Sequence, residues 1–424
     1  MDSTKTLIIG AGITGLSFAA SCKDDDYIII EKENHAGGLC NSIYKDGFIW
    51  DYSGHFLHFK DSDLEESIIS GLGSDGIIKR SKRTQIYYNA QTIDYPFQMN
   101  IHQLNKNEFI DCLYDLYMAK NSVDQPSSFK EMIVSRYGNS ISNKFLIPYN
   151  EKLYACDLNS LDKDALGRFF PHANIDEIIG NIKNEKNSSY NSTYYYPVKG
   201  SLKIIELYLS KIKRESMHFS ERIIDIDIDK KISTTNKRKI KYDKLVSTMP
   251  LTNLLSAAKI NYSKSTLKAN KVLVFNFGYD AESNDKTNHW LYYPDREYVF
   301  YRVGYYNNIN GTEKMSIYVE IGLPEEDTID INYYKECVIR DLKVAGVVTT
   351  QNIIAEHNVI IDPAYVHISE DSEKFKKSIF EQLNASDIYS IGRYGAWKYC
   401  SIEDNIIESH ELAETLKQLQ KKGK

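Results

Sequence analysis

The sequence predicts a mixed α/β (α+β) protein, and three observations support this fold class. A short apolar strand at residues 6–9 runs directly into a glycine-rich turn and an apolar helical stretch. Residues 104–185 carry helical periodicity with few turn signals. Residues 270–365 contain several strand-like segments rich in Tyr, Val and Ile, as in an antiparallel sheet. Together they predict a Rossmann-type domain, a helical insertion and an antiparallel-sheet domain.

The turn after the first strand has the spacing of a dinucleotide-binding βαβ unit. Gly10 allows a tight turn, Gly12 lets the backbone approach a pyrophosphate, and Gly15 lets the helix pack closely on the sheet. The second strand, residues 27–30, ends at Glu31, roughly twenty residues after the first glycine. A carboxylate at this point accepts hydrogen bonds from a ribose diol, so the unit predicts a bound dinucleotide.

Residues 31–38, Glu-Lys-Glu-Asn-His-Ala-Gly-Gly, indicate which dinucleotide is bound. They resemble the glutamate-then-double-glycine segment of FAD-dependent oxidoreductases, in which the two glycines let the chain pass close to the cofactor. We therefore expect FAD rather than NAD. The expected contacts in this part of the chain are Gly10, Gly12, Ile13, Thr14, Gly15, Glu31, Lys32, Gly37, Gly38 and Leu39.

The pattern of segments predicts that the FAD-binding domain is discontinuous. We expect its three parts at residues 1–75, 186–255 and 386–424. Residues 76–103 are expected to supply strands of the substrate sheet, 104–185 the helical insertion and 256–385 the antiparallel-sheet substrate domain.

Composition excludes several classes of function. The chain has 424 residues and a formal net charge of −6, which gives no reason to expect a nucleic-acid partner. Its six cysteines contain no C-x-x-C pair and suit neither a zinc site nor a disulfide framework, so no metal is expected. No apolar run approaches the roughly 18 residues of a membrane-spanning helix, and no signal peptide is evident. We expect a cytoplasmic protein without membrane insertion.

Later segments resemble UDP-galactopyranose mutases, and the first of them contains a histidine. Residues 47–55, Gly-Phe-Ile-Trp-Asp-Tyr-Ser-Gly-His, are similar to the loop that places a histidine on the flavin face in these enzymes. The resemblance assigns Gly54 and His55 to the flavin. It extends patchily from about residue 5 to about residue 415 and is closer to the longer eukaryotic-type mutases than to the short bacterial ones.

Other segments resemble the nucleotide-sugar site of the same family. Residues 95–100, Tyr-Pro-Phe-Gln-Met-Asn, are similar to the segment that holds uracil, and residues 392–399 to a block whose Arg binds diphosphate. The resemblance implies substrate contacts from Tyr95, Phe97, Gln98, Tyr154, Arg168, Asn191, Trp290, Tyr292, Arg302, Tyr365, Arg393 and Tyr399. It implies catalytic roles for His55, Arg302, Tyr365, Arg393 and Tyr399, and flavin contacts for Gly392 and Arg393.

The resemblance implies a redox-neutral isomerase that interconverts the pyranose and furanose forms of a UDP-hexose for a polysaccharide. Reduced flavin (FADH2 or FADH−) attacks the anomeric carbon through N5, and NAD(P)H or another reductant keeps it reduced. Arginines suit the nucleoside diphosphate because they bind phosphate with planar, permanently charged forks. Tyrosine hydroxyls donate to phosphate oxygens without adding charge. The resemblance leaves the oligomeric state open.

Three residues depart from the mutase pattern. Tyr154 stands where the family has Trp, Ile309 where the longer mutases have Tyr, and Ser409 where the last helix of the FAD domain starts with Gly. The first two positions border the sugar and the third borders the flavin, so the identity of the sugar and that flavin contact stay open.

Two other functions fit the same fold. One is an FAD-dependent oxidase or desaturase related to amine and protoporphyrinogen oxidases, which would consume an oxidant. The other is a non-catalytic nucleotide-sugar binder that holds FAD as a structural element, and its reduced form would turn over no sugar.

Overall fold

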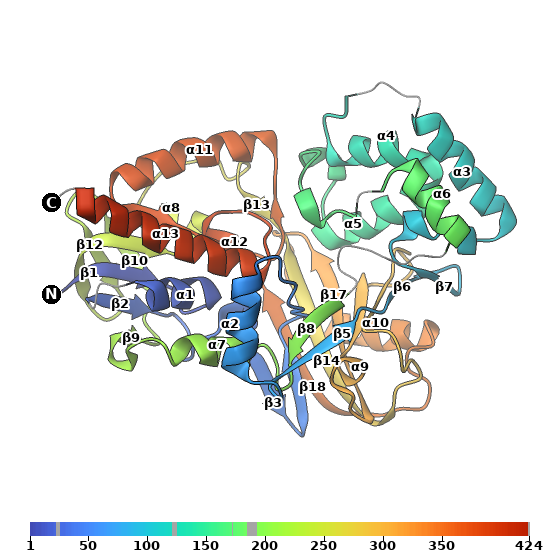
Figure 1. Cartoon of the computed structure of the whole chain (residues 1–424), viewed down its shortest axis with the longest axis horizontal. Coiled ribbons are helices and arrows are strands. Elements are labelled where there is room, and N and C mark those ends of the chain that lie inside the picture. The colour runs from blue at the N-terminus through green and yellow to red at the C-terminus, as the bar shows by residue number, and fades with distance from the viewer. Residues whose placement is uncertain (23–25, 121–124, 172, 185–192, 423–424) are drawn as a thin grey trace.

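The computed structural model describes residues 1–22, 26–120, 125–171, 173–184 and 193–422. Figure 1 shows three parts. The part at the left is built on a parallel sheet and contains both ends of the chain, the helices at the upper right form an insertion, and a second sheet lies at the lower right. Asn191, which the sequence assigns to the substrate, lies outside the described residues.

The first sheet is formed by segments from the beginning, middle and end of the chain. Its parallel core has β1 at the centre, with β2 and then β9 on one side and β12 and then β20 on the other. The antiparallel strands β10 and β11 extend it beyond β12. The strands are β1 Asp2–Ile9, β2 Tyr27–Ile30, β9 Met217–His218, β10 Ile223–Asp227, β11 Ile232–Thr235, β12 Lys239–Ser247 and β20 Ile388–Ser390.

Helices cover both faces of this sheet because its strands are apolar on both sides. The successive residues Leu7 and Ile8 of β1 point to opposite faces of the sheet and belong to different core clusters. One cluster includes side chains from α1 Ile13–Ser21, α2 Ser62–Leu72, α7 Leu202–Leu209 and α13 Ile402–Lys422. The other includes side chains from α8 Leu251–Ala257 and α11 Glu370–Ala385.

The second sheet has the strand order β18-β14-β17-β16-β15-β6-β7. Every pair is antiparallel except β15 with β6, which is parallel. Side chains of α10 pack on it through Val338 and Leu342. Its elements are β6 Thr84–Tyr88, β7 Gln91–Asp94, β14 Lys271–Glu282, β15 Trp290–Tyr292, β16 Arg302–Tyr305, α9 Tyr306–Asn310, β17 Lys314–Leu323, α10 Ile331–Val344 and β18 Ile353–Ile361.

The helical insertion shares a core with β6, β7 and β15 of the second sheet. Phe97, Phe129, Ile133 and Phe145 are among its fully or almost fully buried side chains. Its helices are α3 Lys106–Lys120, α4 Phe129–Ile141, α5 Ile147–Tyr154 and α6 Ile175–Asn184. These four helices confirm the helical periodicity of residues 104–185.

Several short elements lie outside the two large sheets. The hairpin of β3 Ser42–Lys45 and β4 Phe48–Asp51 precedes the His55 loop. β13 Lys268–Ala269 pairs with β19 Val366–His367. The short helix α12 Gly392–Gly395 precedes α13.

Two segments differ from the expected organisation. β5 Ile77–Ser81 does not join the second sheet; it pairs with β8 Thr193–Pro197, because these two segments are the chain's outward and return crossings between the two large parts. Helix α11 lies in the range expected for the antiparallel-sheet domain, yet its apolar face packs against the first sheet. In the described part of the chain, no helix is both long and apolar enough to cross a membrane.

Gly15 tests the packing of α1 on β1. A β-carbon at Gly15 would lie 2.0 Å from the carbonyl oxygen of Gly10, which is backbone and cannot move aside. We expect Gly15→Ala to lower the free energy of unfolding by about 1–3 kcal/mol, the range for an overpacked contact. Denaturant unfolding measures the change.

Gly180→Ala is the matched control. Gly180 lies inside α6, and a β-carbon there would meet no atom within 4 Å. This substitution should raise stability by up to about 1 kcal/mol through helix propensity. Equal effects of the two substitutions would contradict the account of Gly15.

Candidate dinucleotide and substrate site

The glycine turn after β1 leaves free space at one position only among its three glycines. Gly10 has φ +102°, and a β-carbon there would lie 2.3 Å from the Thr248 hydroxyl oxygen. A β-carbon on Gly15 would collide with the Gly10 carbonyl oxygen. A β-carbon on Gly12 would meet only the Cα of Gly38, at 3.9 Å. The turn therefore offers its backbone at Gly12 to a ligand, as a pyrophosphate requires.

Glu31 is held beside this turn. The residue is 9% exposed; its Oε2 accepts a hydrogen bond from the Ala11 N–H at 2.8 Å, and its Oε1 accepts one from the Glu33 N–H at 3.0 Å. The Gly37 N–H donates to the Ala11 carbonyl at 2.9 Å, so the double-glycine segment lies against the same turn. Gly37 and Gly38 have φ of +133° and +55°, conformations that favour glycine.

Other expected cofactor residues have different surroundings. The Lys32 side chain is 72% exposed and its ammonium lies 3.6 Å from the Glu33 carboxylate, so it faces solvent. Ile13 is buried in the core under α1, and Leu39 is partly buried in a short turn at Gly38–Cys40.

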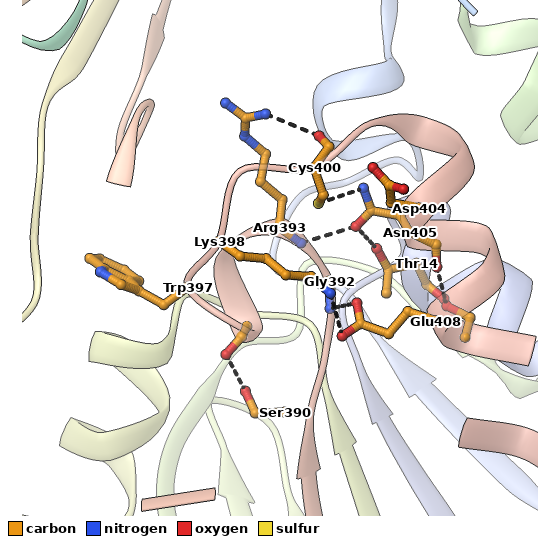
Figure 2. A network of polar contacts seen from close by, with 12 residues as sticks. Thr14, Ser390, Gly392, Arg393, Trp397, Lys398, Cys400, Asp404, Asn405 and Glu408 are labelled. Carbon is orange, nitrogen blue, oxygen red and sulfur yellow. Dashed lines mark hydrogen bonds and ion pairs between the residues drawn. The ribbon is translucent and has the colours of Figure 1, made fainter. Parts of the chain in front are cut away.

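The C-terminal block returns to the turn through Asn405 (Figure 2). The Asn405 side-chain oxygen accepts hydrogen bonds from the Thr14 hydroxyl at 2.9 Å and from the Arg393 N–H at 3.0 Å. The Gly392 N–H donates to Glu408 at 2.9 Å, and Gly392 has φ +85°. These contacts join α1, α12 and α13 around the start of the Arg393 side chain.

Ser409 lies in this region, in the second turn of α13 rather than at its start. It is fully buried, and its hydroxyl oxygen is 2.9 Å from the Thr14 carbonyl and 2.8 Å from the Asn405 carbonyl. The serine that departs from the mutase pattern therefore packs α13 against α1.

The Arg393 side chain leaves this network and enters a group of aromatic rings. Figure 2 shows it extending away from Thr14 and Glu408, with its guanidinium near the Cys400 carbonyl. Its Cζ lies 4.6 Å from the centre of the Tyr399 ring and 5.4 Å from that of Tyr365, and these two rings are stacked. Burial opposes the charge of Arg393, but the surrounding tyrosines raise its pKa in net, so it stays charged.

Arg302 reaches the same group from β16. Its Nε donates to Glu320 on the neighbouring strand β17 at 2.6 Å, and the other Glu320 oxygen accepts from the Ser53 hydroxyl. The Glu320 side chain is 1% exposed. Burial lowers the pKa of Arg302 and Glu320 raises it; the net shift is upward, so Arg302 stays charged. The Arg302 Cζ lies 5.4 Å from the Trp290 ring.

Tyr365 links the two arginines. Burial and then Tyr399 raise its pKa, while the positive charges of Arg302 and Arg393 both act to lower it. Both guanidinium groups therefore lie within electrostatic reach of one hydroxyl. We call this group the aromatic–arginine cluster; it comprises Tyr154, Trp290, Tyr292, Arg302, Tyr365, Arg393 and Tyr399.

The segment expected to hold a base borders the cluster. The Tyr95 ring centre lies 5.2 Å from that of Tyr292. Gln98 is fully buried; its amide nitrogen donates to the Pro171 carbonyl, and its side-chain oxygen has no partner among the described residues. The Phe97 side chain instead lies in the core of the insertion, stacked on Phe145 at 5.4 Å, so its ring is not available to a substrate.

His55 and Arg168 have contrasting positions. The Nδ1 atom of His55 is buried and has no hydrogen-bond partner among the described residues. Burial lowers the histidine pKa, Asp51 and the Ser53 backbone act to raise it, and the net shift is downward. Arg168 is not in the cluster: it forms an ion pair with Asp404 on α13. It lines a cavity of about 450 Å³ between residues 164–169 and α13, which Tyr399 also borders.

The prediction from sequence missed several cluster neighbours. Tyr149 lies 4.9 Å from Tyr292 and Tyr301 lies 6.1 Å from Tyr149. Glu320 could be found only from the register of β16 and β17, which places it opposite Arg302. Lys82, whose ammonium lies 4.9 Å from the Trp290 ring, stands in the basic run Lys-Arg-Ser-Lys-Arg at 79–83. Among the described residues, no group of three or more His, Cys, Asp or Glu is placed to hold a metal.

Comparisons with known proteins agree with this geometry. A family model for NAD(P)-binding Rossmann-like domains matches residues 8–66. The crystal structure of a reduced UDP-galactopyranose mutase superposes with a TM-score of 0.91 at 22% identity, covering 98% of this chain and 96% of that one. The chain has the UDP-galactopyranose mutase fold.

Two oxidases are also similar to this chain. A putative protoporphyrinogen oxidase from Exiguobacterium sp. 255-15 superposes with a TM-score of 0.77 at 15% identity, covering 98% of this chain and 99% of that one. In sequence, 215 residues are 26% identical to coproporphyrinogen III oxidase of Staphylococcus aureus (strain NCTC 8325 / PS 47). That match spans 45% of each chain, less than half of the curated relative.

We expect the Arg302–Glu320 pair to stabilise the fold as well as to position the Arg302 guanidinium. Glu320→Ala leaves a buried guanidinium without its carboxylate, and we expect a loss of about 3–5 kcal/mol in the free energy of unfolding. Glu313→Ala, an exposed glutamate just before β17, should change it by less than about 0.5 kcal/mol. Chemical denaturation of both variants makes the comparison, and equal losses would contradict the pairing.

Proposed function

We propose that this protein is an FAD-dependent nucleotide-sugar mutase of the UDP-galactopyranose mutase family, acting on a UDP-hexose. One observation carries the proposal. Arg302 comes from the second sheet and Arg393 from α12 beside the first sheet, yet both guanidinium groups lie on rings of the aromatic–arginine cluster. Two permanent positive charges among tyrosine hydroxyls suit a nucleoside diphosphate, which carries about two negative charges.

The dinucleotide turn supports FAD as the cofactor. Gly12 leaves room for a pyrophosphate, and the Glu31 carboxylate lies at the ribose position of such a site. The Nδ1 of His55, which is buried and has no partner in the described part of the chain, suits a hydrogen bond with a polar group of a flavin ring. The lowered pKa of His55 keeps this imidazole neutral near pH 7, so it can donate from one nitrogen and accept at the other.

The chain's own residues bind and orient the sugar nucleotide. Tyr95 would stack on the base and Gln98, with its unpartnered oxygen, would accept from the base edge. Arg302, held by Glu320, and Arg393 would stabilise the diphosphate as it leaves the anomeric carbon and until it returns. The reduced flavin, when bound, supplies the nucleophile, and NAD(P)H or another reductant prepares it.

An FAD-dependent oxidase is the second candidate, because the sequence match to coproporphyrinogen III oxidase favours it. A pair of arginines also suits a carboxylated substrate, so charge does not separate the two functions. Their redox balance does, since an oxidase transfers electrons from each substrate molecule to an acceptor and a mutase transfers none in net.

The experiment that tests the proposal is a substrate screen. Dithionite-reduced protein is incubated anaerobically with UDP-, dTDP- and GDP-hexoses, and the products are separated by chromatography. A new isomer from a UDP-hexose is expected. No isomer from any of these sugars, together with conversion of a porphyrinogen or amine in air, would leave the oxidase as the function.

The two arginines give a sharper expectation. Arg302→Ala and Arg393→Ala should each lower turnover about 10²–10³-fold, because a developing charge loses a preorganised partner. Arg340→Ala, whose side chain is 64% exposed on α10, should leave turnover unchanged. Steady-state rates of isomer formation are the measurement, and a full rate in either cluster variant would contradict the assignment.

Gly12→Val tests the cofactor assignment separately. A β-carbon at this position has room in the ligand-free protein, and the valine side chain would occupy the space of the pyrophosphate. We expect purified Gly12→Val to fold, as judged by circular dichroism, and to contain no flavin by absorbance. Gly180→Val on α6 should keep its flavin. Full flavin occupancy in Gly12→Val would show that the cofactor binds elsewhere.

A further inference from the structure

Lys82 is a third cation at the aromatic–arginine cluster. It lies in the connection between β5 and β6, within the basic run 79–83. Its ammonium nitrogen is 4.9 Å from the centre of the Trp290 ring and 5.4 Å from that of Tyr95. Lys79 in the same run is exposed and contacts Tyr195 instead. Lys82 is therefore the lysine of the run that points into the site.

The ammonium of Lys82 has no anionic partner in the described part of the protein. No carboxylate there lies within 4.0 Å of it, and no hydrogen-bond acceptor is placed for it. Arg302 contacts the same Trp290 ring, at 5.4 Å. Burial, and then the charge of Arg302, lower the pKa of Lys82 to about 8. Two cations on one ring repel each other unless an anion lies between them.

The position of Lys82 indicates which phosphate of the proposed ligand it would contact. Lys82 contacts Tyr95, the expected base-stacking ring, whereas Arg393 lies on Tyr365 and Tyr399 at the other end of the cluster. In a nucleoside diphosphate sugar, the phosphate nearest the base is the α-phosphate. A cation beside the base-stacking ring is therefore placed for that group.

We propose that Lys82 binds the α-phosphate of the nucleotide and so selects phosphorylated uridine over uridine. This inference rests on the proposed function, since it requires a nucleotide with its base on Tyr95. It assigns three cations to the diphosphate, with Lys82 at the nucleoside end and Arg393 at the sugar end.

Binding of uridine, UMP and UDP to the flavin-loaded protein tests the assignment by calorimetry. Lys82→Met should weaken UMP and UDP about 10- to 100-fold, as expected for a lost charge-assisted hydrogen bond, and leave uridine unchanged. Arg393→Ala should weaken UDP but not UMP. Lys79→Met, the exposed neighbour, should bind all three ligands as the parent does.

Each other outcome overturns a distinct claim. If UMP binds Lys82→Met as tightly as the parent, Lys82 does not bind the α-phosphate, and the proposed function stands. If Lys82→Met binds uridine more weakly by the same factor as UMP, Lys82 supports the base-stacking rings only. If the parent binds neither UMP nor UDP, the proposed function fails and the Lys82 assignment fails with it.

The dependence of UMP affinity on pH gives a second readout. Lys82 is protonated below its pKa of about 8, so its contribution is present below that pH and is lost as the pH rises through it. The parent's affinity should fall about tenfold between about pH 7 and 9. Lys82→Arg should keep the affinity and lose this dependence, because a guanidinium does not titrate there. An unchanged pH profile in Lys82→Arg would contradict the proposal.

The other charged groups around Lys82 do not titrate in this range. Burial and nearby cations lower the pKa of both His58 and His289 to about 4, so both are neutral. Arg302 remains charged and the pKa of Tyr95 is raised by burial. The second pKa of a phosphate ester is about 6, so UMP stays dianionic.

The stability of the ligand-free protein distinguishes a binding role of Lys82 from a structural role. An unpaired, partly buried ammonium costs free energy, so Lys82→Met should have a melting temperature equal to or above that of the parent. A melting temperature several degrees lower would mean that Lys82 supports the fold, and the binding loss would then be indirect.

Discussion

The hydrogen bonds of the Asn405 side chain connect the cofactor turn to the substrate site. Its oxygen accepts from Thr14, 391 residues away in sequence, and from the backbone of Arg393. Thr14 lies in the first turn of α1, between Gly12 and Gly15, whereas Arg393 carries its guanidinium into the aromatic rings. One amide thereby fixes the distance between the expected pyrophosphate position and a cation of the substrate site. Ser409 reinforces the same junction from the next turn of α13.

The charges around the cluster are held in different ways. Arg302 is fixed by a buried carboxylate, which makes it a rigid element of the second sheet. The guanidinium of Arg393 lies near two carbonyl oxygens and three tyrosine rings, and none of these contacts is a carboxylate. Arg393 and Lys82 therefore bring positive charge that the described protein does not neutralise nearby. A dianionic ligand supplies that neutralisation, which is why the site suits a diphosphate better than a neutral substrate.

Local sequence was enough to predict the parts of the fold that depend on neighbours in the chain. The Gly10–Gly15 turn and Glu31 belong to one short βαβ unit, and helical periodicity located α3 and α4. Pairing between distant segments was not predictable in this way. β5 pairs with β8 across the whole insertion, and α11 packs on the first sheet although it follows strands of the second.

The same distinction applies to the site. Resemblance to the mutases found the arginines and Tyr365, whereas Glu320 becomes visible only once β16 and β17 are in register. Phe97 is an aromatic of the right kind in the right segment, but its ring faces the insertion core because the backbone turns there into a short helix. Lys82 was hidden in a run of basic residues, since sequence does not tell which member of such a run points inward.

The most direct test of the central claim is the number of product molecules formed for each reducing equivalent. Protein is reduced anaerobically with a known amount of dithionite, and a UDP-hexose is added in large excess. A mutase returns its flavin to the reduced state after every cycle, so the account predicts many isomer molecules per equivalent without oxygen. One product per equivalent, or product only when oxygen is admitted, would contradict it.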